Sequence, residues 1–344
     1  MKIVADSAIP FIEGVFDPYA EVVSKPGLEI TREDVADADA LLIRTRTKCN
    51  AALLDGSSVR MIATATIGTD HIDLGYCHDK GIYVANAAGC NAGGVMDYVF
   101  SALYGVAARK SIDLTGATFG IVGVGSVGSK VERMAMNLGF KVLLCDPPRE
   151  AREGSSQFCD LENLLENSDI VTLHVPLEES TRGMANEEFF SRMKQGAIFI
   201  NASRGEVVVD EALIDAIPKL GAVVIDTWNG EPHINRQLMD LVDIATPHIA
   251  GYSYQGKQNG TKAVVRAIAR FFDIKELFDF FPAGDVPGLD AVNLNIAGLP
   301  QGQIASQFQY SYPIFTDDFM FRMAPENFEK MRSEYHYRRE FYIE

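Results

Sequence analysis

The segment from Thr118 to Asp146 constrains the fold of this chain more than any other part of the sequence. It reads TFGIVGVGSVGSKVERMAMNLGFKVLLCD, and its apolar run over 119–122 predicts a buried strand. A helical pattern follows over 127–138, and a second apolar run over 141–145 predicts a second strand. A strand, a helix and a strand in this order predict a parallel βαβ unit.

Three glycines between the first strand and the helix have the spacing G-x-G-x-x-G. Gly123 allows a tight turn, Gly125 lets the backbone approach a pyrophosphate, and Gly128 lets the helix pack closely on the sheet. The helix N-terminus offers free N–H groups and a partial positive charge to the phosphates. We therefore expect Gly123, Gly125, Ser126, Val127 and Gly128 to contact a dinucleotide.

Asp146 ends the second strand, eighteen residues after Gly128. An acidic side chain at this place accepts hydrogen bonds from the ribose hydroxyls of an adenosine. A carboxylate also repels a 2′-phosphate, so the motif favours NAD over NADP. Arg149 lies close by in the sequence and acts against this preference.

Composition narrows the classes of function. The 47 acidic and 31 basic residues give a net charge of −16, which argues against nucleic-acid and anionic-membrane binding. We see no signal peptide, no membrane-spanning stretch and no zinc-ligand spacing, and we expect a cytoplasmic protein without a structural metal. The cysteines are scattered and odd in number, which is typical of reduced thiols: Cys49, Cys77, Cys90, Cys145 and Cys159.

With 344 residues the chain is too long for one ordinary core. Strand-length apolar runs alternate with helical patterns on both sides of position 91, which predicts an α/β fold of two Rossmann-like, doubly wound parallel-sheet domains with a small C-terminal α+β segment. We place a substrate-binding domain at 1–90, completed by residues 254–280, in which we expect a returning helix at 260–278. The NAD-binding domain covers 91–253, and the C-terminal region covers 281–344, with a Pro/Gly/Asn-rich linker at 281–303.

Polar clusters follow four predicted strands of the second domain, at residues 174–177, 201–205, 226–232 and 246–252. Because the carboxyl ends of parallel strands meet at one edge of a sheet, these clusters share one crevice. This placement predicts an active site there.

Three residues of these clusters suit the oxidation of a 2-hydroxy acid. Arg204 has a rigid fork of donors that matches a carboxylate, and His248 can move a proton near neutral pH. Glu231 can bond the far nitrogen of the imidazole and fix its tautomer. Hydride then passes to the nicotinamide while His248 takes the hydroxyl proton, and Asp226 is expected to bond the nicotinamide amide.

Two loops of the first domain also follow strands. The segment 44–48 (RTRTK) has three bases in an acidic chain, and we interpret it as a phosphate or carboxylate site rather than a solvated loop. The second loop, 64–71 (TATIGTDH), offers Thr66 and the flexible Gly68 to a ligand. We interpret His71 as structural, since Asp70 and His71 open the next helix.

In these features the sequence resembles the D-isomer-specific 2-hydroxyacid dehydrogenases. The resemblance rests on the glycine motif with its terminal acid and on segments 201–205 (NASRG), 226–232 (DTWNGEP) and 247–251 (PHIAG). Further segments resemble the branch of this family that oxidises a phosphorylated four-carbon sugar acid: 43–45 (IRT), 64–71, 88–91 (AGCN), 144–148 (LCDPP) and 249–257 (IAGYSYQGK).

The resemblance implies roles for individual residues. Arg204, Glu231 and His248 are implied to be catalytic, and Thr45, where the family usually has Ser, is implied to contact substrate. NAD is the implied cofactor, and a small phosphorylated hydroxy acid is the implied substrate. Taken together, the expected cofactor contacts outside the glycine segment are Asp146, His174, Ala202, Ser203, Asp226 and Gly251, and the expected substrate contacts are Arg44, Thr45, Arg46, Thr66, Gly68 and Tyr252.

Two alternatives stay open. Another D-2-hydroxyacid dehydrogenase, acting on 3-phosphoglycerate or glycerate, shares the general motifs. A non-catalytic NADH-sensing protein would need a partner surface, and the many aromatic residues of 310–344 can supply one. Those aromatics either pack on their own subunit or form an interface, and the family's C-terminal dimerisation domain, matched by 335–341 (YHYRREF), favours a homodimer.

Overall fold

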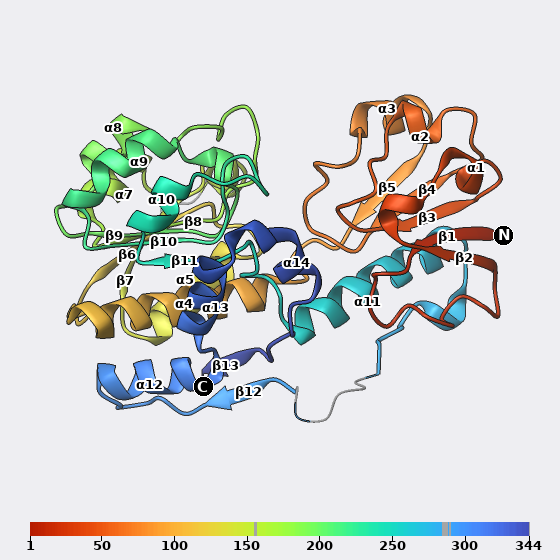
Figure 1. Ribbon diagram of the computed structural model, residues 1–344. Helices are drawn as coiled ribbons and strands as arrows, with labels where there is room; N and C mark the ends of the chain where they lie inside the picture. The colour runs from red at the N-terminus through yellow and green to blue at the C-terminus, as the bar shows by residue number, and fades with distance from the viewer. Residues whose placement is uncertain (155–156, 284–287, 289, 344) are drawn as a thin grey trace. The chain divides into compact units, whose positions relative to one another are not determined.

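The computed structural model describes every residue of the chain except 155–156, 284–287, 289 and 344. It divides into two compact units. One contains Met1–Asn91 and Tyr254–Leu289, and the other contains Ala92–Ser253 and Asp290–Glu344. Both are built on parallel sheets, so the prediction of a two-part α/β fold is confirmed (Figure 1). Residues 290–344 pack with the second unit rather than forming a third one.

The first unit has a five-stranded parallel sheet with the order β2-β1-β3-β4-β5. Alternate strand residues face opposite sides, as the two-residue period of a strand requires. Ile3, Ala40 and Met61 pack with helix α11, whereas Val4 and Leu41 pack with the short helices of the other face. The bounds are β1 Lys2–Asp6, β2 Glu21–Lys25, β3 Ala40–Ile43, β4 Met61–Thr64, β5 Tyr83–Asn86, α1 Arg32–Val35, α2 Ala51–Leu54, α3 Leu74–Asp79 and α11 Tyr254–Phe271.

The second unit has a six-stranded parallel sheet with the order β11-β10-β9-β8-β6-β7, covered by helices on both faces (Figure 1). Its core elements are β6 Thr118–Val122, β7 Lys141–Cys145, β8 Ile170–Leu173, β9 Ile198–Asn201, β10 Ala222–Ile225, β11 Ile244–Ala245, α4 Ala92–Lys110, α5 Gly128–Asn137, α6 Pro147–Glu153, α7 Leu161–Asn167, α8 Glu187–Arg192, α9 Asp210–Ala216 and α10 Arg236–Leu241. The chain runs from β6 outward to β7 and then returns to β8 on the other side of β6. The switch point therefore lies between β6 and β8, where ligands bind in such sheets.

The C-terminal residues wrap onto this second unit. Helix α12 (Gln301–Ser311) packs on α4, and β12 (Val292–Leu294) pairs in parallel with β13 (Phe341–Ile343). Helices α13 (Ile314–Met323) and α14 (Phe328–Ser333) lie between them in the sequence. Five aromatic side chains of this region are buried within the chain itself: Phe308, Tyr312, Phe321, Phe328 and Phe341. Packing on the same subunit therefore accounts for much of the aromatic tail.

Some predicted elements were wrong in their limits. The returning helix was expected at 260–278, but α11 ends at Phe271, and Asp273 has a left-handed backbone with φ of 55°. Strand β2 was not predicted, since its sequence EVVSK mixes polar with apolar residues at the sheet edge. Strand β12 lies inside the predicted linker at 281–303, of which 284–287 and 289 are outside the described residues.

Candidate active site

The three glycines after β6 have three different surroundings. Gly123 has φ of +87°, and a Cβ atom there would lie 2.7 Å from the carbonyl of His174. A Cβ on Gly128 would lie 2.1 Å from the oxygen of Gly123, so only glycine lets α5 start this close to the strand. A Cβ on Gly125 would have no heavy atom within 4 Å. The backbone at Gly125 is thus open to a ligand, as pyrophosphate binding requires.

The start of α5 is also suited to an anion. Its N-cap residue is Val127, which supplies no side-chain hydrogen bond, and its first turn contains no acidic residue. The first turn of α5 therefore contributes no carboxylate of its own to neutralise the partial positive charge of the helix N-terminus. These features fit a bound pyrophosphate.

Substituting these glycines is expected to separate folding from cofactor binding. Gly128→Ala should lower the free energy of unfolding by about 1–3 kcal/mol, because the new methyl group has no room. Gly125→Ala should leave that free energy near the wild-type value but weaken NADH binding, because the methyl group occupies space that the pyrophosphate needs. Urea unfolding and a fluorescence titration with NADH measure the two effects. Equal losses of stability in both variants would contradict this difference.

Asp146 faces the glycine segment. Its Oδ2 accepts the N–H of Val124 at 2.7 Å, and its Oδ1 accepts the N–H of Arg149 at 2.9 Å as the N-cap of α6. Each carboxylate oxygen has a further lone pair for a ribose hydroxyl. The Arg149 guanidinium donates to the Val124 carbonyl and pairs with Glu153 at 2.7 Å. Arg149 is thus held by protein groups, and a 2′-phosphate would meet the Asp146 carboxylate, which supports NAD.

His174 follows β8 at the switch point, next to Gly123. Burial lowers the pKa of its imidazole to about 3, so the ring is neutral at physiological pH. The Thr172 hydroxyl lies 3.1 Å from its Nε2. A neutral ring at this place is compatible with the expected cofactor contact and not with a charge-based role.

Arg204 lies in a tight turn after β9. The Asn201 side chain accepts hydrogen bonds from the N–H and hydroxyl of Ser203 and donates one to the Arg204 carbonyl. A Cβ on Gly205 would lie 1.9 Å from the carbonyl carbon of Trp228. The Arg204 turn therefore packs directly on the segment that leads to Glu231, and glycine at 205 makes this approach possible.

Glu231 and His248 form a hydrogen-bonded pair, as expected from the sequence. Oε2 of Glu231 lies 2.8 Å from Nδ1 of His248, and Oε1 accepts the Trp228 N–H at 2.8 Å. Both side chains are partly exposed, at 19% and 29% respectively. The carboxylate holds the imidazole with Nδ1 toward Glu231, which leaves Nε2 for proton exchange with a ligand.

The Glu231 carboxylate is kept ionised by its partners. Burial acts to raise its pKa, but the charge and hydrogen bond of His248, the Trp228 N–H and the charge of Arg332 outweigh burial and lower it. A lowered pKa means that the pair stabilises the fold above the ordinary carboxyl pKa of 4.5, and that this contribution disappears as the pH falls through the lowered value.

Glu231→Gln is therefore expected to lower the free energy of unfolding near neutral pH by about 1.5–3 kcal/mol, the range for a hydrogen bond to a charged group. The difference between wild type and variant should shrink as the pH falls below 4.5. Denaturant unfolding at a series of pH values measures this difference. A difference that grows with acidification would contradict the assignment.

Asp226 has a different environment from the one expected. The side chain is fully buried, and its carboxyl oxygens accept the Thr246 hydroxyl at 2.7 Å, the Ile249 N–H at 2.8 Å and the Ala250 N–H at 3.0 Å. Burial raises its pKa, partly offset by His248 and these donors. Asp226 thus holds the backbone that follows His248, whatever contact it also makes with a nicotinamide amide.

Tyr252 lies against residues that sequence reasoning did not assign to the site. Its ring is 5.9 Å from Tyr335 in an edge-to-face arrangement and 6.5 Å from Tyr337. Arg338 also contacts the 249–252 backbone. The aromatic and basic run at 335–341 was the only sequence signal for this contact, and it was interpreted as a dimerisation motif.

The loops expected to contact substrate in the first unit lie side by side. Ile43 and Thr64 are register partners at the ends of β3 and β4, so Thr45 and Thr66 occur at equivalent positions beyond the sheet. The Thr66 hydroxyl donates to the Gly68 carbonyl at 3.0 Å and lies 2.7 Å from the Thr64 hydroxyl.

Residues 44–46 and His71 of the first unit differ in their surroundings. Arg44 donates to the Ala8 carbonyl at 3.0 Å, whereas Thr45 and Arg46 are exposed. His71 Nε2 lies 3.2 Å from the Thr64 hydroxyl, and burial lowers the pKa of its ring. His71 is thus a partnered, partly buried residue, which is compatible with a structural role. The expectation that Asp70 and His71 open the next helix was wrong, because α3 begins at Leu74 with Asp73 as its N-cap.

The site residues therefore fall into two sets. The second unit brings together the Arg204 turn, Glu231, His248 and Asp226 at the carboxyl ends of its strands, as well as the glycine segment and Asp146. The first unit places Arg44, Thr45 and Arg46 after β3, and Thr66 and Gly68 after the neighbouring strand β4. Within the described parts of the chain, no group of three or more His, Cys, Asp or Glu residues has the geometry of a metal site.

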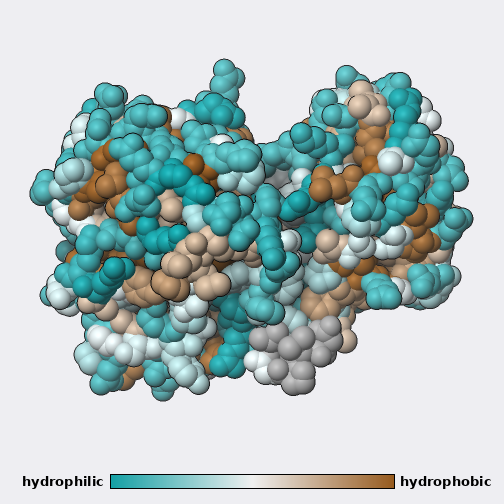
Figure 2. Space-filling model, viewed as in Figure 1, coloured by the Kyte–Doolittle hydropathy of each residue, from teal (hydrophilic) through white to brown (hydrophobic). Residues whose placement is uncertain are grey.

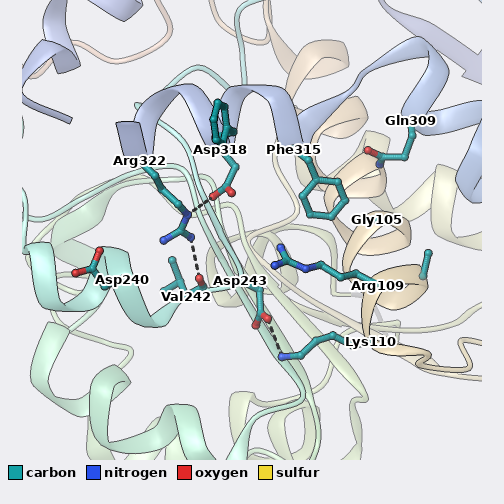
Figure 3. A pocket seen from close by; sticks show the side chains of 12 residues that line it. Gly105, Arg109, Lys110, Asp240, Val242, Asp243, Gln309, Phe315, Asp318 and Arg322 are labelled. Carbon is teal, nitrogen blue, oxygen red and sulfur yellow. Dashed lines mark hydrogen bonds and ion pairs between the residues drawn. The ribbon is translucent and has the colours of Figure 1, made fainter. Parts of the chain in front are cut away.

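A separate pocket of about 980 Å³ lies between the end of α4, the α10–β11 connection and α13 (Figure 3). Four of its charged side chains form two ion pairs: Lys110 with Asp243 at 2.7 Å and Arg322 with Asp318 at 2.8 Å. It contains none of the residues expected to be catalytic. We therefore give it no part in the chemistry considered below.

Comparison with known proteins agrees with this fold. Residues 102–250 match the family model described as D-isomer specific 2-hydroxyacid dehydrogenase, NAD binding domain. The chain is similar in structure to an NAD⁺-bound 3-phosphoglycerate dehydrogenase of Entamoeba histolytica, with 26% identity, a TM-score of 0.68, and coverage of 81% of this chain and 97% of that one.

The chain belongs to the D-isomer-specific 2-hydroxyacid dehydrogenases, and it is an NAD-dependent enzyme. Its similar relatives are named erythronate-4-phosphate dehydrogenase. The protein of Bacteroides fragilis is 42% identical over 353 residues, covering 99% of this chain and 97% of the relative. That of Bacteroides thetaiotaomicron is 43% identical over 348 residues, with the same coverage.

Proposed function

We propose that the enzyme oxidises 4-phospho-D-erythronate to 3-hydroxy-2-oxo-4-phosphooxybutanoate with NAD, in the biosynthesis of pyridoxal 5′-phosphate. The hydrogen bond between Glu231 and His248 is the observation that carries the chemical part of this proposal. The names of the relatives supply the substrate.

In the proposed reaction His248 Nε2 takes the proton of the C2 hydroxyl as the C2–O bond becomes a carbonyl. Glu231 stabilises the imidazolium that forms, because its carboxylate is ionised and lies 2.8 Å from Nδ1. Arg204 holds the substrate carboxylate through a bidentate pair and orients C2. NAD, when bound at the glycine segment, accepts the hydride that leaves C2.

The 4-phosphate is assigned to the first unit. Arg44, Thr45, Arg46 and Thr66 supply cationic and hydroxyl donors there. A local basic site is required because the chain has a net charge of −16 and repels an anionic substrate at long range.

The test is NADH formation by the purified protein with three acids: 4-phospho-D-erythronate, 3-phospho-D-glycerate and unphosphorylated D-erythronate. A marked preference for the first supports the proposal. Equal or better turnover of 3-phosphoglycerate would favour the second candidate, which the structural likeness to a 3-phosphoglycerate dehydrogenase suggests. NADH binding without turnover of any acid would favour a sensor protein.

We also propose that the enzyme is a homodimer and works in the cytoplasm. Tyr310, Phe319, Met320 and Met323 of α12 and α13 are more than half exposed, although the surface in Figure 2 is largely hydrophilic. All five cysteines are free, as in a reducing compartment. Among the described helices none is long and apolar enough to cross a membrane. Sedimentation of the purified protein at two-chain mass would support the dimer, and a one-chain mass would oppose it.

A further inference from the structure

The backbone after His248 is held from two sides. On one side, the N–H groups of Ile249 and Ala250 donate to the Asp226 carboxyl group. On the other side, the carbonyl groups of the same two residues accept hydrogen bonds from Arg338. The backbone N–H group of each residue is therefore bonded to the Asp226 carboxyl group, and its carbonyl group is bonded to the Arg338 guanidinium.

The Arg338 guanidinium donates hydrogen bonds to four backbone carbonyl groups. Nη1 donates to Ile249 at 3.2 Å and to Tyr252 at 3.1 Å, while Nη2 donates to Gly94 at 2.8 Å and to Ala250. The guanidinium lies 4.0 Å above the Tyr312 ring, which fixes its plane. A planar group with donors on both outer nitrogens suits several carbonyls at once, and an ammonium group does not.

The residues next to Arg338 hold the end of the same loop. The backbone of Ser253 forms an isolated parallel β-bridge with that of Arg338, and the Ser253 hydroxyl donates to Glu340 Oε1 at 2.7 Å. The Phe341 N–H donates to Asp97 Oδ2 in α4 at 3.0 Å. The C-terminal residues are thus attached both to the 248–253 loop and to the core helix α4.

Two adjacent glycines of α4 make room for this arrangement. A Cβ on Gly93 would lie 2.1 Å from Glu340 Oε2, and a Cβ on Gly94 would lie 2.9 Å from the Ser253 hydroxyl. A larger residue at either position would displace the Glu340 or the Ser253 side chain. The tail, the loop and α4 are therefore packed as one junction.

The loop needs such support because His248 has a left-handed backbone, with φ of 56°. This conformation is unfavourable for a residue with a side chain and persists only where surrounding contacts fix it. Asp226 and Arg338 supply those contacts on the residues that follow directly.

We infer that Arg338 is a positioning residue for the dehydrogenase reaction: its guanidinium fixes the 249–252 backbone and so holds His248 and Tyr252 in place. The inference rests on the proposed function for its effect on turnover. Its structural part, the clamping of the loop, can be tested without turnover.

The experiment compares Arg338→Lys and Arg338→Gln with wild type, and uses Lys330→Gln as the control, because Lys330 is exposed in the same C-terminal region. Hydrogen exchange of the peptide containing residues 247–254, kcat, the KM for substrate and the Kd for NADH are measured for each protein. In Arg338→Lys we expect faster exchange confined to this peptide and a kcat about 100-fold lower, the loss typical of a misplaced catalytic group. NADH affinity should fall less than kcat, because the glycine segment and Asp146 are unaffected, and Lys330→Gln should match wild type.

Rescue provides a readout that a purely structural role would not give. Methylguanidinium added to Arg338→Ala should restore part of the lost kcat, whereas methylammonium should not, because only the former reproduces the planar fork. Unchanged exchange of the 247–254 peptide in Arg338→Lys would overturn the inference, and so would a kcat within twofold of wild type. Loss of folding in every Arg338 variant would also overturn it, in favour of a structural role alone.

The outcomes separate this inference from the proposed function. If wild type turns over none of the three acids, the proposed function fails, and the exchange data still decide whether Arg338 clamps the loop. If wild type oxidises 4-phospho-D-erythronate but the loop is unaffected by the Arg338 substitutions, the inference fails alone.

Discussion

Replacing His248 with Gln is expected to lower kcat for 4-phospho-D-erythronate by about 10²–10⁴-fold, the usual contribution of a general acid–base group. Glutamine can accept a hydrogen bond from the substrate hydroxyl but cannot take up its proton. Glu231 would also lose the partner that it contacts at 2.8 Å. Steady-state NADH formation measures the effect on turnover.

Cofactor binding in this variant should stay within a few-fold of wild type, because the glycine segment and Asp146 are unchanged. His78→Gln is the matched control, since His78 is an exposed histidine of α3 in the first unit, and it should retain full activity. Turnover by His248→Gln at the wild-type rate would exclude His248 as the proton acceptor. A parallel loss of NADH binding would show that the substitution disturbs more than proton transfer.

Replacing both Arg44 and Arg46 with Ala is expected to remove most of the preference for a phosphorylated substrate. Each charged hydrogen bond to the phosphate contributes about 1.5–3 kcal/mol, so each should change kcat/KM for 4-phospho-D-erythronate by roughly 10–100-fold. The loss should appear mainly in KM, because the phosphate is remote from the reacting C2 atom. Activity with unphosphorylated D-erythronate should hardly change.

Lys80→Ala serves as the control for the loss of positive charge, since Lys80 is exposed and pairs with Asp55 at 3.4 Å on the same unit. A small, salt-dependent effect is expected there. Should the double variant keep the wild-type KM for 4-phospho-D-erythronate, the phosphate does not bind at this loop and the substrate assignment is wrong.

Much of the sheet architecture could be predicted, because buried parallel strands are continuous apolar runs. The run at 141–145 coincides with β7, and the run at 119–122 lies within β6. Strand β2 was missed because it is a half-exposed edge strand with mixed residues. Strand β12 was missed because only three residues pair with a partner nearly fifty positions away, and no local pattern indicates such a pairing.

The same division holds for the candidate site. The Glu231–His248 pair could be predicted, because the two residues follow neighbouring parallel strands and have complementary chemistry. The environment of Asp226 could not, because its partners include backbone N–H groups, which every sequence has. The aromatic contacts of Tyr252 with the tail were likewise unpredicted, since they depend on how the last residues return to the unit.

The sequence by itself thus determined the glycine geometry, the alternation of strands and helices, and the residues able to bind a dinucleotide and move a proton. These features depend on residue type and short-range spacing, which can be read directly from the sequence. Only the tertiary structure decided how the His248 loop is held. Arg338 lies 86 to 89 positions further along the chain and bonds to backbone carbonyl groups of this loop. Because every residue type has a backbone carbonyl group, the sequence gives no sign of these contacts.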